Sequence, residues 1–349
     1  MYLGLIILGV KLSPLLPRKQ ISFKHLSNKY IAIDGNNMLY QFLALIRTPD
    51  GRPLTDSRGR ITSHLIGLLY RTTHLIIEHN IKTVFIFDGK PPRIKSRELE
   101  KRREERKKLK EQWMEAIERG DLRTAWSKAV RMDSLSKTMV DDAKRLLKFL
   151  GIPVIQAPSE GEAQAAYMAK KGDVWCASSQ DYDSLLFGAP RLVRNLTLTG
   201  RKAKPSKGIV YRLLPELITL NDVLNEHSIT YEQLIDIAIL IGTDYYEGIH
   251  GVGPKTALKL IKKFGTIENL PAKYLSKLDM DIVNYVRDVF KKPEVTDNYS
   301  LEFRDVDGNK IIEFLCDEHD FNRERVEKVI HELKMKRKIT GQSSLESWF

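Results

Sequence analysis

Seven acidic residues stand at points in the chain where their carboxylates could act together. Short apolar runs alternate with helical patterns, which is typical of an α/β fold with a mostly parallel central sheet flanked by helices. In open sheets of this kind, functional sites form at the carboxyl ends of the strands. The candidate acids are Asp34, Asp88, Glu160, Glu162, Asp181, Asp183 and Asp244.

The predicted strands explain why these acids should meet. We predict strands over 29–34, 83–88, 152–156, 173–178 and 191–195. Asp34 and Asp88 end two of them, and QDYD (180–183) follows another within five residues. One aspartate at a strand end is usually a cap or turn residue. Several at the same edge of a sheet indicate a site.

Glu160 and Glu162, in APSEGEAQAA (157–166), allow two interpretations. Ser159 followed by Glu162 has the spacing of a capping box at the start of a helix, and acids in a first turn suit the helix dipole. Alternatively, both glutamates belong to the site. The gathering of other carboxylates favours the site, with Glu162 able to cap as well.

A cluster of seven carboxylates needs positive charge beside it. Two carboxylates about 4 Å apart repel by ~4 kcal/mol at an effective dielectric constant near 20, so a bare cluster would take up protons. Oxygen ligands suit Mg²⁺ or Mn²⁺ rather than zinc. Two such ions about 4 Å apart fit in-line displacement at phosphorus. The acids therefore predict a metal site that cuts a phosphate ester.

The composition indicates the kind of substrate. The 349 residues contain 57 Lys+Arg and 45 Asp+Glu, a net charge of +12, which favours an anionic partner, most simply nucleic acid. This length suits one large domain with insertions or two domains. The two cysteines, Cys176 and Cys316, argue against a zinc site or disulfide framework and fit a reducing compartment. The apolar N-terminus is too short to span a membrane.

A basic segment separates two of the predicted strands. Residues 93–110 contain ten Lys/Arg and four Glu in a helical pattern that continues toward Ile117. The segment is either an ordinary solvated helix or part of an insertion, 93–140, over the edge where the acids gather. Lys95 and Arg102 are seven residues apart on one face of this helix and could reach a scissile phosphate.

Three later segments carry further signals. Residues 197–207 are expected to form a basic, turn-rich loop, and 235–265 reads as helix, loop, helix. Gly251 and Gly253 precede Pro254, an arrangement that lets backbone amides approach a phosphate; the alternative is a plain helical hairpin. The chain ends on exposed aromatic residues, which suggests a docking peptide.

Six stretches together form a specific pattern. They are IAIDGNNMLYQFL, VFIFDGKPPRIKSRELEKR, GIPVIQAPSEGEAQAAYM, SSQDYDSLLFG, IGTDYYEGIHGVGPKTALKLI and QSSLESWF. On these residues the chain resembles the structure-specific 5′ nucleases of the XPG/Rad2 family, and among them the archaeal flap endonucleases, over essentially all of 9–349.

The resemblance implies an activity. Such enzymes hydrolyse one DNA phosphodiester at the base of a 5′ flap by a two-metal mechanism and have 5′-3′ exonuclease activity, in Okazaki fragment maturation and base excision repair. It implies two Mg²⁺ per active site, with Mn²⁺ as a substitute, and K⁺ at the helix–two-turn–helix element when DNA is bound. A non-catalytic DNA-binding clamp adaptor and an RNA-directed 5′ nuclease remain alternatives.

The resemblance also implies roles for single residues. The seven acids match the metal ligands, and Lys95 and Arg102 match catalytic cations of the helical arch. The DNA-binding positions are Tyr40, Arg47, Arg71, Gly251, Gly253 and Lys255. Tyr40 could instead be a core tyrosine on a helix over 36–47, and the two arginines ordinary surface charges. The anchors of a peptide for the sliding clamp PCNA are Gln342, Leu345, Trp348 and Phe349.

The implied organisation follows the same likeness. It comprises an N-terminal nuclease region (9–107), the helical arch (93–140), an internal nuclease region (124–266) with the helix–two-turn–helix (235–265), a C-terminal helical region (267–335) and a tail (336–349). Residues 1–8 depart from the family pattern, and we expect them to be a mis-called extension before a start at Leu8. The expected protein is a cytoplasmic, nucleoid-associated monomer of an archaeal cell, with no membrane contact.

Overall fold

The computed structural model describes residues 10–48, 51–119, 121, 124, 128, 135–197, 200–204 and 209–346. A seven-stranded sheet forms its centre, in the order β1-β9-β6-β5-β2-β3-β4. In that order the strands are Lys19–Gln20, Glu216–Thr219, Arg191–Arg194, Cys176–Ser178, Tyr30–Asp34, Lys82–Phe87 and Val154–Gln156. β2 runs parallel to both β3 and β5, whereas β9 is antiparallel to β6 and β1. The predicted mostly parallel α/β sheet is confirmed.

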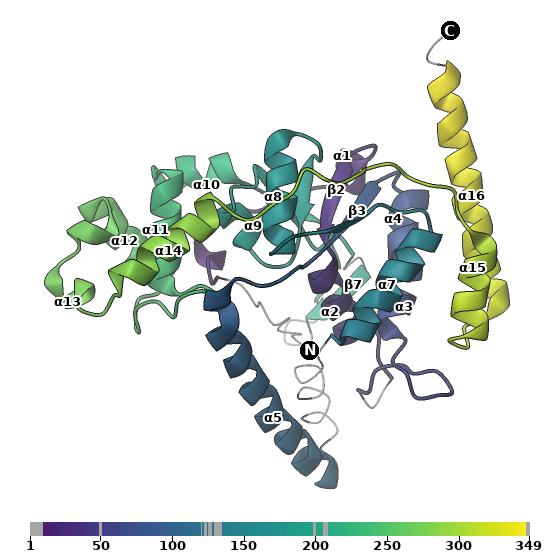
Figure 1. Ribbon diagram of the computed structural model, residues 1–349, viewed down its shortest axis with the longest axis horizontal. Helices are drawn as coiled ribbons and strands as arrows, with labels where there is room; N and C mark the ends of the chain where they lie inside the picture. The colour runs from purple at the N-terminus through teal and green to yellow at the C-terminus, as the bar shows by residue number, and fades with distance from the viewer. Residues whose placement is uncertain are drawn as a thin grey trace.

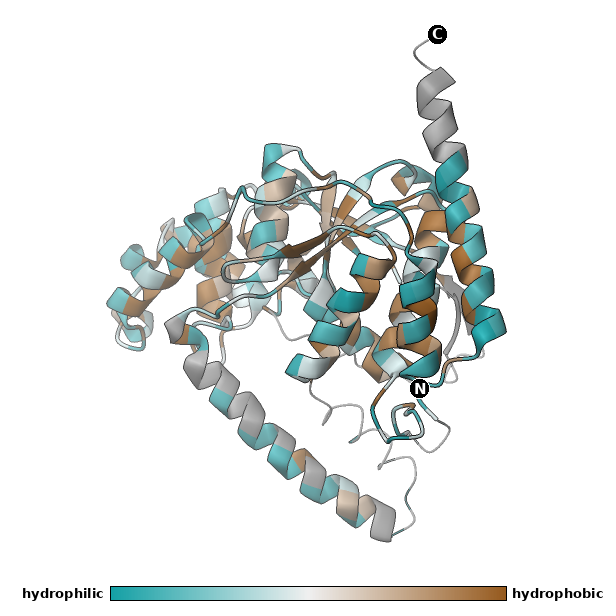
Figure 2. Cartoon of the chain, turned by 45° about the vertical axis from the view of Figure 1, so that its right-hand side comes forward, coloured by the Kyte–Doolittle hydropathy of each residue, from teal (hydrophilic) through white to brown (hydrophobic). Residues whose placement is uncertain are grey.

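The sheet is buried on both faces because its strands alternate their apolar side chains. Ile31 and Ile33 of β2 face one hydrophobic cluster, and Ala32 between them faces the other. The Ala32 side is covered by α8 (Gly161–Lys171), α11 (Tyr231–Ile241), α12 (Pro254–Phe264) and α14 (Met280–Lys291). The Ile31 side is covered by α2 (Gly35–Leu45), α4 (Thr73–Ile77), α7 (Lys137–Phe149), α15 (Gly308–Ile312) and α16 (Arg323–Glu346). Figure 2 shows the apolar strands enclosed between these helices.

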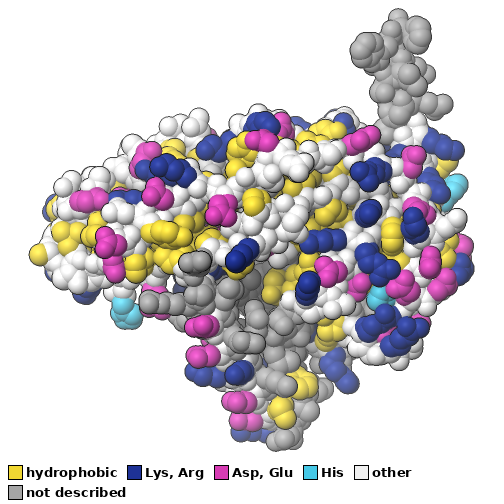
Figure 3. All heavy atoms as spheres, viewed as in Figure 1, with side chains coloured by type: hydrophobic (Ala, Val, Ile, Leu, Met, Phe, Trp, Pro, Cys, Tyr) yellow, Lys and Arg dark blue, Asp and Glu magenta, His cyan; other side chains and the backbone are white. Residues whose placement is uncertain are grey.

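The basic segment forms a long helix. α5 (Ser96–Glu118) follows a short 3-10 turn over Arg93–Lys95 and projects away from the sheet, as Figure 1 shows. Figure 3 shows acidic and basic side chains mixed along it, while Lys and Arg gather over α7 and α16. Most of 120–134, where we expect the rest of the arch, lies outside the described residues.

One local prediction is wrong. The segment 197–207 is not a turn-rich loop throughout, because β7 (Gly200–Lys204) pairs antiparallel with β8 (Ile209–Leu213). The partner strand, IVYRL, is rich in residues that favour strands. Its backbone pairs with Gly200–Lys204, so this basic stretch becomes a strand. The antiparallel strands β9 and β1, the latter at the edge of the sheet, are too short to give a recognisable alternating pattern in the sequence.

The helix–loop–helix of 235–265 is confirmed, with an earlier start. α11 begins at Tyr231 with a capping box between Thr230 and Gln233. α12 begins at Pro254 with Gly253 as its N-cap, and Gly251 in the connecting loop has a φ of 82°. No helix in the described part of the chain is both long enough and apolar enough to cross a membrane.

Candidate active site

Two aspartates at neighbouring strand ends fix the helices that follow them. Asp34 ends β2, and its Oδ1 accepts a hydrogen bond from the Asn37 amide at 2.9 Å, which caps α2. Asp88 follows β3, and its Oδ1 accepts from the Gly161 amide at 2.7 Å at the start of α8. The other oxygen of Asp88 accepts from the Asn36 side chain at 2.7 Å. These bonds hold both carboxylates at the carboxyl edge of the sheet.

The start of α8 answers the question about its two glutamates. The helix begins at Gly161 and its N-cap is Glu160, whose side chain makes no capping hydrogen bond. The alternative interpretation, a capping box of Ser159 and Glu162, is therefore not borne out, because the N-cap is Glu160 and Asp88 provides the acceptor at this helix end. Neither glutamate side chain caps this helix.

The loop between β5 and a short helix, α9 (Asp183–Leu186), brings two more carboxylates to the same edge. Asp181 accepts a hydrogen bond from the Asn37 side chain at 2.8 Å. Asp183 accepts one from the Val10 amide at 3.1 Å. Asn37 is a site residue that sequence reasoning missed, although its place in the first turn after Asp34 was a usable signal.

Burial and mutual repulsion raise the pKa values of these carboxyls. Burial, followed by the neighbouring Asp88, raises the pKa of Asp34 well above its ordinary value. Burial, followed by Asp183, does the same for the pKa of Glu162. The pKa of Asp183 rises to about 8, first through burial and then through Asp244 and Asp181. The acids therefore form one electrostatic group.

Lys95 lies against this group. Its Nζ is 2.8 Å from Glu160 Oε2 and 3.2 Å from Asp244 Oδ2, and only 14% of its side chain is exposed. Burial opposes its charge, but Glu160 and Asp244 outweigh burial and raise the pKa of Lys95. Burial raises the pKa of Glu160 despite this ion pair. The alternative of an ordinary solvated helix therefore fails at Lys95. The predicted placement of Lys95 and Arg102 on one face of a single helix is also wrong, because Lys95 ends the 3-10 turn before α5 and only Arg102 lies in the helix.

The donor set suits a hard divalent cation. All seven candidates offer carboxylate oxygens, and the buried Oε1 atoms of Glu160 and Glu162 have no hydrogen-bond partner. Among the described residues, however, no three Asp, Glu, His or Cys side chains surround one point as metal ligands do. The structure thus gathers the acids without arranging a complete coordination shell, and the single charge of Lys95 is shared between two of them, Glu160 and Asp244.

The predicted DNA-binding residues lie outside this cluster. Tyr40 is partly buried on α2. Arg47 donates to the Gly51 carbonyl at 2.7 Å, and Arg71 donates to the Thr197 carbonyl at 2.6 Å.

The remaining predicted residues lie on three other segments. Gly251, Gly253 and Lys255 lie at the loop before α12. The backbone of Arg102 lies in α5. Of the clamp anchors, Gln342 and Leu345 fall on α16, while Trp348 and Phe349 lie outside the described residues.

Comparisons with known proteins identify the class to which this fold and site belong. The XPG N-terminal domain matches residues 9–109, and the XPG I-region matches 151–244. In structure, the chain is similar to the catalytic core of Rad2 in complex with DNA substrate, at 22% identity and a TM-score of 0.65, covering 92% of this chain and 97% of that one. That likeness concerns the fold.

Nearer relatives narrow the class. Flap endonuclease 1 of Thermococcus onnurineus is 54% identical over 343 residues, covering 98% of this chain and 99% of that protein. That of Archaeoglobus fulgidus is 49% identical, covering 98% and 100%. The solved flap endonuclease-1 of Methanococcus jannaschii has 43% identity and a TM-score of 0.73, covering 94% and 98%. The chain belongs to the flap endonuclease family of structure-specific 5′ nucleases.

Proposed function

We propose that this chain hydrolyses one DNA phosphodiester at the base of a 5′ flap, using divalent metal ions held by the seven acids. The observation that carries the proposal is the buried carboxylate cluster at the edge of the sheet, with Lys95 beside it. Such a cluster is costly to ionise without cations. Because the chain belongs to the flap endonuclease family, a DNA flap is the substrate to test.

The acids would hold two Mg²⁺ ions, with Mn²⁺ as a substitute, and these ions when bound activate water and stabilise the leaving oxygen. Asn36 and Asn37 orient Asp88 and Asp181 through their side-chain amides. Lys95, at the rim of the cluster, can donate to a non-bridging oxygen of the scissile phosphate. Arg102 is proposed as a second cation from α5.

Other residues would hold the rest of the DNA. The amides at the start of α12, with Gly251, Gly253 and Lys255, are proposed to bind a backbone phosphate, and K⁺ is proposed to share this loop. Arg47 and Arg71 are proposed phosphate contacts, and Tyr40 a stacking surface for the nucleotide beside the cut. The residues 342–349 are proposed to bind a sliding clamp, with the enzyme itself a monomer.

The test is cleavage of a 5′-labelled double-flap DNA, with and without Mg²⁺, read at single-nucleotide resolution. We expect one Mg²⁺-dependent cut beside the junction. Asp181→Ala should abolish cleavage and keep DNA binding, since it removes a ligand and no phosphate contact. Glu226→Gln, which neutralises an exposed acid on α10 (Leu220–His227), is the matched control. Normal turnover by Asp181→Ala would refute the metal-site assignment.

Two further measurements distinguish the flap endonuclease from an RNA-directed nuclease and from a clamp adaptor. An RNA flap cut faster than the DNA flap would favour an RNA-directed nuclease, and tight binding without any cut would favour the clamp adaptor. Deletion of 342–349 should leave basal cleavage unchanged and remove stimulation by the clamp. Loss of basal cleavage on deletion would give the tail a structural role instead.

A further inference from the structure

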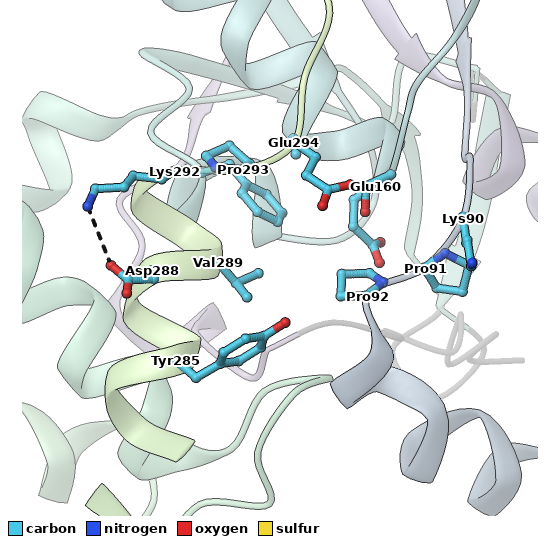
Figure 4. Close-up of a pocket in the computed structure, with 13 residues that line it drawn as sticks. Lys90, Pro91, Pro92, Glu160, Tyr285, Asp288, Val289, Lys292, Pro293 and Glu294 are labelled. Carbon is cyan, nitrogen blue, oxygen red and sulfur yellow. Dashed lines mark ion pairs between the residues drawn. The ribbon is translucent and has the colours of Figure 1, made fainter. Parts of the chain in front are cut away.

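A pocket of about 500 Å³ lies beside the acid cluster and has no role in the scheme above. One wall is the connector Lys90–Pro92 that leads into α5, and another is the start of α8 with Glu160 and Ala163. The opposite wall is α14, with Tyr285 and Val289. Figure 4 shows Tyr285 and Pro92 facing each other across the opening.

The charges of this pocket disfavour a phosphate. It is lined by two ammonium groups, Lys90 and Lys292, and three carboxylates, Glu160, Asp288 and Glu294. Lys292 is already paired with Asp288 at 3.9 Å. An anionic group entering here would meet more negative charge than positive charge. A neutral occupant is therefore favoured.

The remaining lining suits a flat, apolar occupant. Proline rings, Ala163, Phe187 and Val289 supply apolar surface. Tyr285 is 48% exposed, and it is the one aromatic ring among the large apolar side chains that stand out as exposed in the described part of the chain. An exposed aromatic ring at the edge of a nucleic-acid site is a typical stacking surface for a base. The carboxylates can accept hydrogen bonds from amino groups of a base.

We propose that this pocket receives one unpaired nucleobase of the flap strand, on the side of the cut phosphodiester opposite the nucleotide that is proposed to stack on Tyr40. The inference rests on the proposed function, because it needs a single-stranded segment at the acid cluster. Glu160 belongs to both the pocket and the cluster, so a nucleotide adjoining the scissile phosphate can reach the pocket. Enzymes that act on nucleic acids commonly hold an extruded base between aromatic and apolar side chains.

The experiment combines an enzyme change with a substrate change. Single-turnover cleavage is measured on double-flap DNA in which one nucleotide at a time, on either side of the cut, lacks its base. With the complete substrate, Tyr285→Ala should slow cleavage about tenfold, the effect of losing one stacked base. Tyr285→Phe should keep the wild-type rate. Met335→Ala, which alters an equally exposed side chain on α16, is the control.

The decisive result is non-additivity at one position. There, the abasic nucleotide should slow the wild-type enzyme about tenfold and leave the rate of Tyr285→Ala unchanged, because each change removes the same contact. A 2-aminopurine at that position should be quenched by the wild-type enzyme and not by Tyr285→Ala. Additive effects at every position, or a wild-type rate for Tyr285→Ala, would overturn the proposal. Absence of wild-type cleavage on complete DNA would instead contradict the proposed function.

Discussion

Replacing Asp183 by asparagine should stabilise the metal-free protein. Asp183 is 6% exposed and lies among other acids, which together raise its pKa from an ordinary 3.8 to about 8. Between these two values the folded protein holds a proton that the unfolded chain has lost, so stability falls as the pH rises. Above pH 8 the full destabilisation is present, and below pH 4 it is absent. Asparagine carries no charge at either pH.

The size of the effect follows from the same pKa difference. At pH 9 the difference between 3.8 and about 8 corresponds to about 6 kcal/mol. Because Asp183 titrates together with its neighbours, this figure belongs to the group, and one substitution relieves a part of it. Even a third, about 2 kcal/mol, raises the Tm by about 3 °C in a chain of this size. Asparagine also keeps an oxygen to accept the bond from the Val10 amide.

The assay is thermal unfolding in EDTA at pH 9 and pH 4.5, repeated at pH 9 with Mg²⁺. We expect Asp183→Asn to have the higher Tm at pH 9 in EDTA, a Tm equal to wild type at pH 4.5, and a smaller gain from Mg²⁺. Asp141→Asn, which neutralises an exposed acid on α7, should change none of these values. A variant less stable than wild type at pH 9 in EDTA would show that repulsion within the cluster has been misjudged.

Three other changes test separate parts of the structure. Lys95→Ala should slow cleavage by about 100-fold or more, since one electrostatic stabiliser is lost. The control Lys107→Ala, on the exposed side of α5, should leave the rate unchanged. A wild-type rate for Lys95→Ala would mean that Lys95 takes no part in the chemical step. Burial lowers the pKa of His64 to about 3, so urea unfolding should show stability lost as the pH falls below about 6.5, with a flatter profile for His64→Gln. Gln164→Ala should cost about 2–3 kcal/mol in the same urea assay, because the buried amide holds Thr296 by two hydrogen bonds of 2.8 and 2.9 Å; an unchanged midpoint would mean that the segment after α14 needs no such anchor.

The sequence was most informative where one physical rule decided the outcome. The alternating burial of β2 and the acids at strand ends follow from the period of a strand and the geometry of a parallel sheet. Asp34 and Asp88 therefore lie at the predicted edge. The start of α12 at Pro254 likewise follows from the fixed φ angle of proline.

The sequence was less informative where distant residues compete for one role. Ser159 and Glu162 have the right spacing for a capping box, but Asp88, more than seventy positions earlier, takes the Gly161 amide instead. The strand β7 forms because β8 pairs with it. Tyr285 carries no local signal, since its place opposite Pro92 depends on how α14 packs beside the connector into α5. Such roles require the tertiary structure.

The connector 88–95 joins the parts of the site into one mechanical unit. Its first residue, Asp88, caps α8; Pro91 and Pro92 line the pocket; and Lys95 pairs with Glu160. Lys95 stands three residues beyond Pro92, so a displacement of the connector as a whole would move both Lys95 and the pocket wall. DNA that pulls Lys95 toward a phosphate would alter the opening for a base in the same movement. Under the proposal that the pocket holds a base, recognition of an unpaired nucleotide and placement of the cationic side chain would be coupled through one short stretch of backbone.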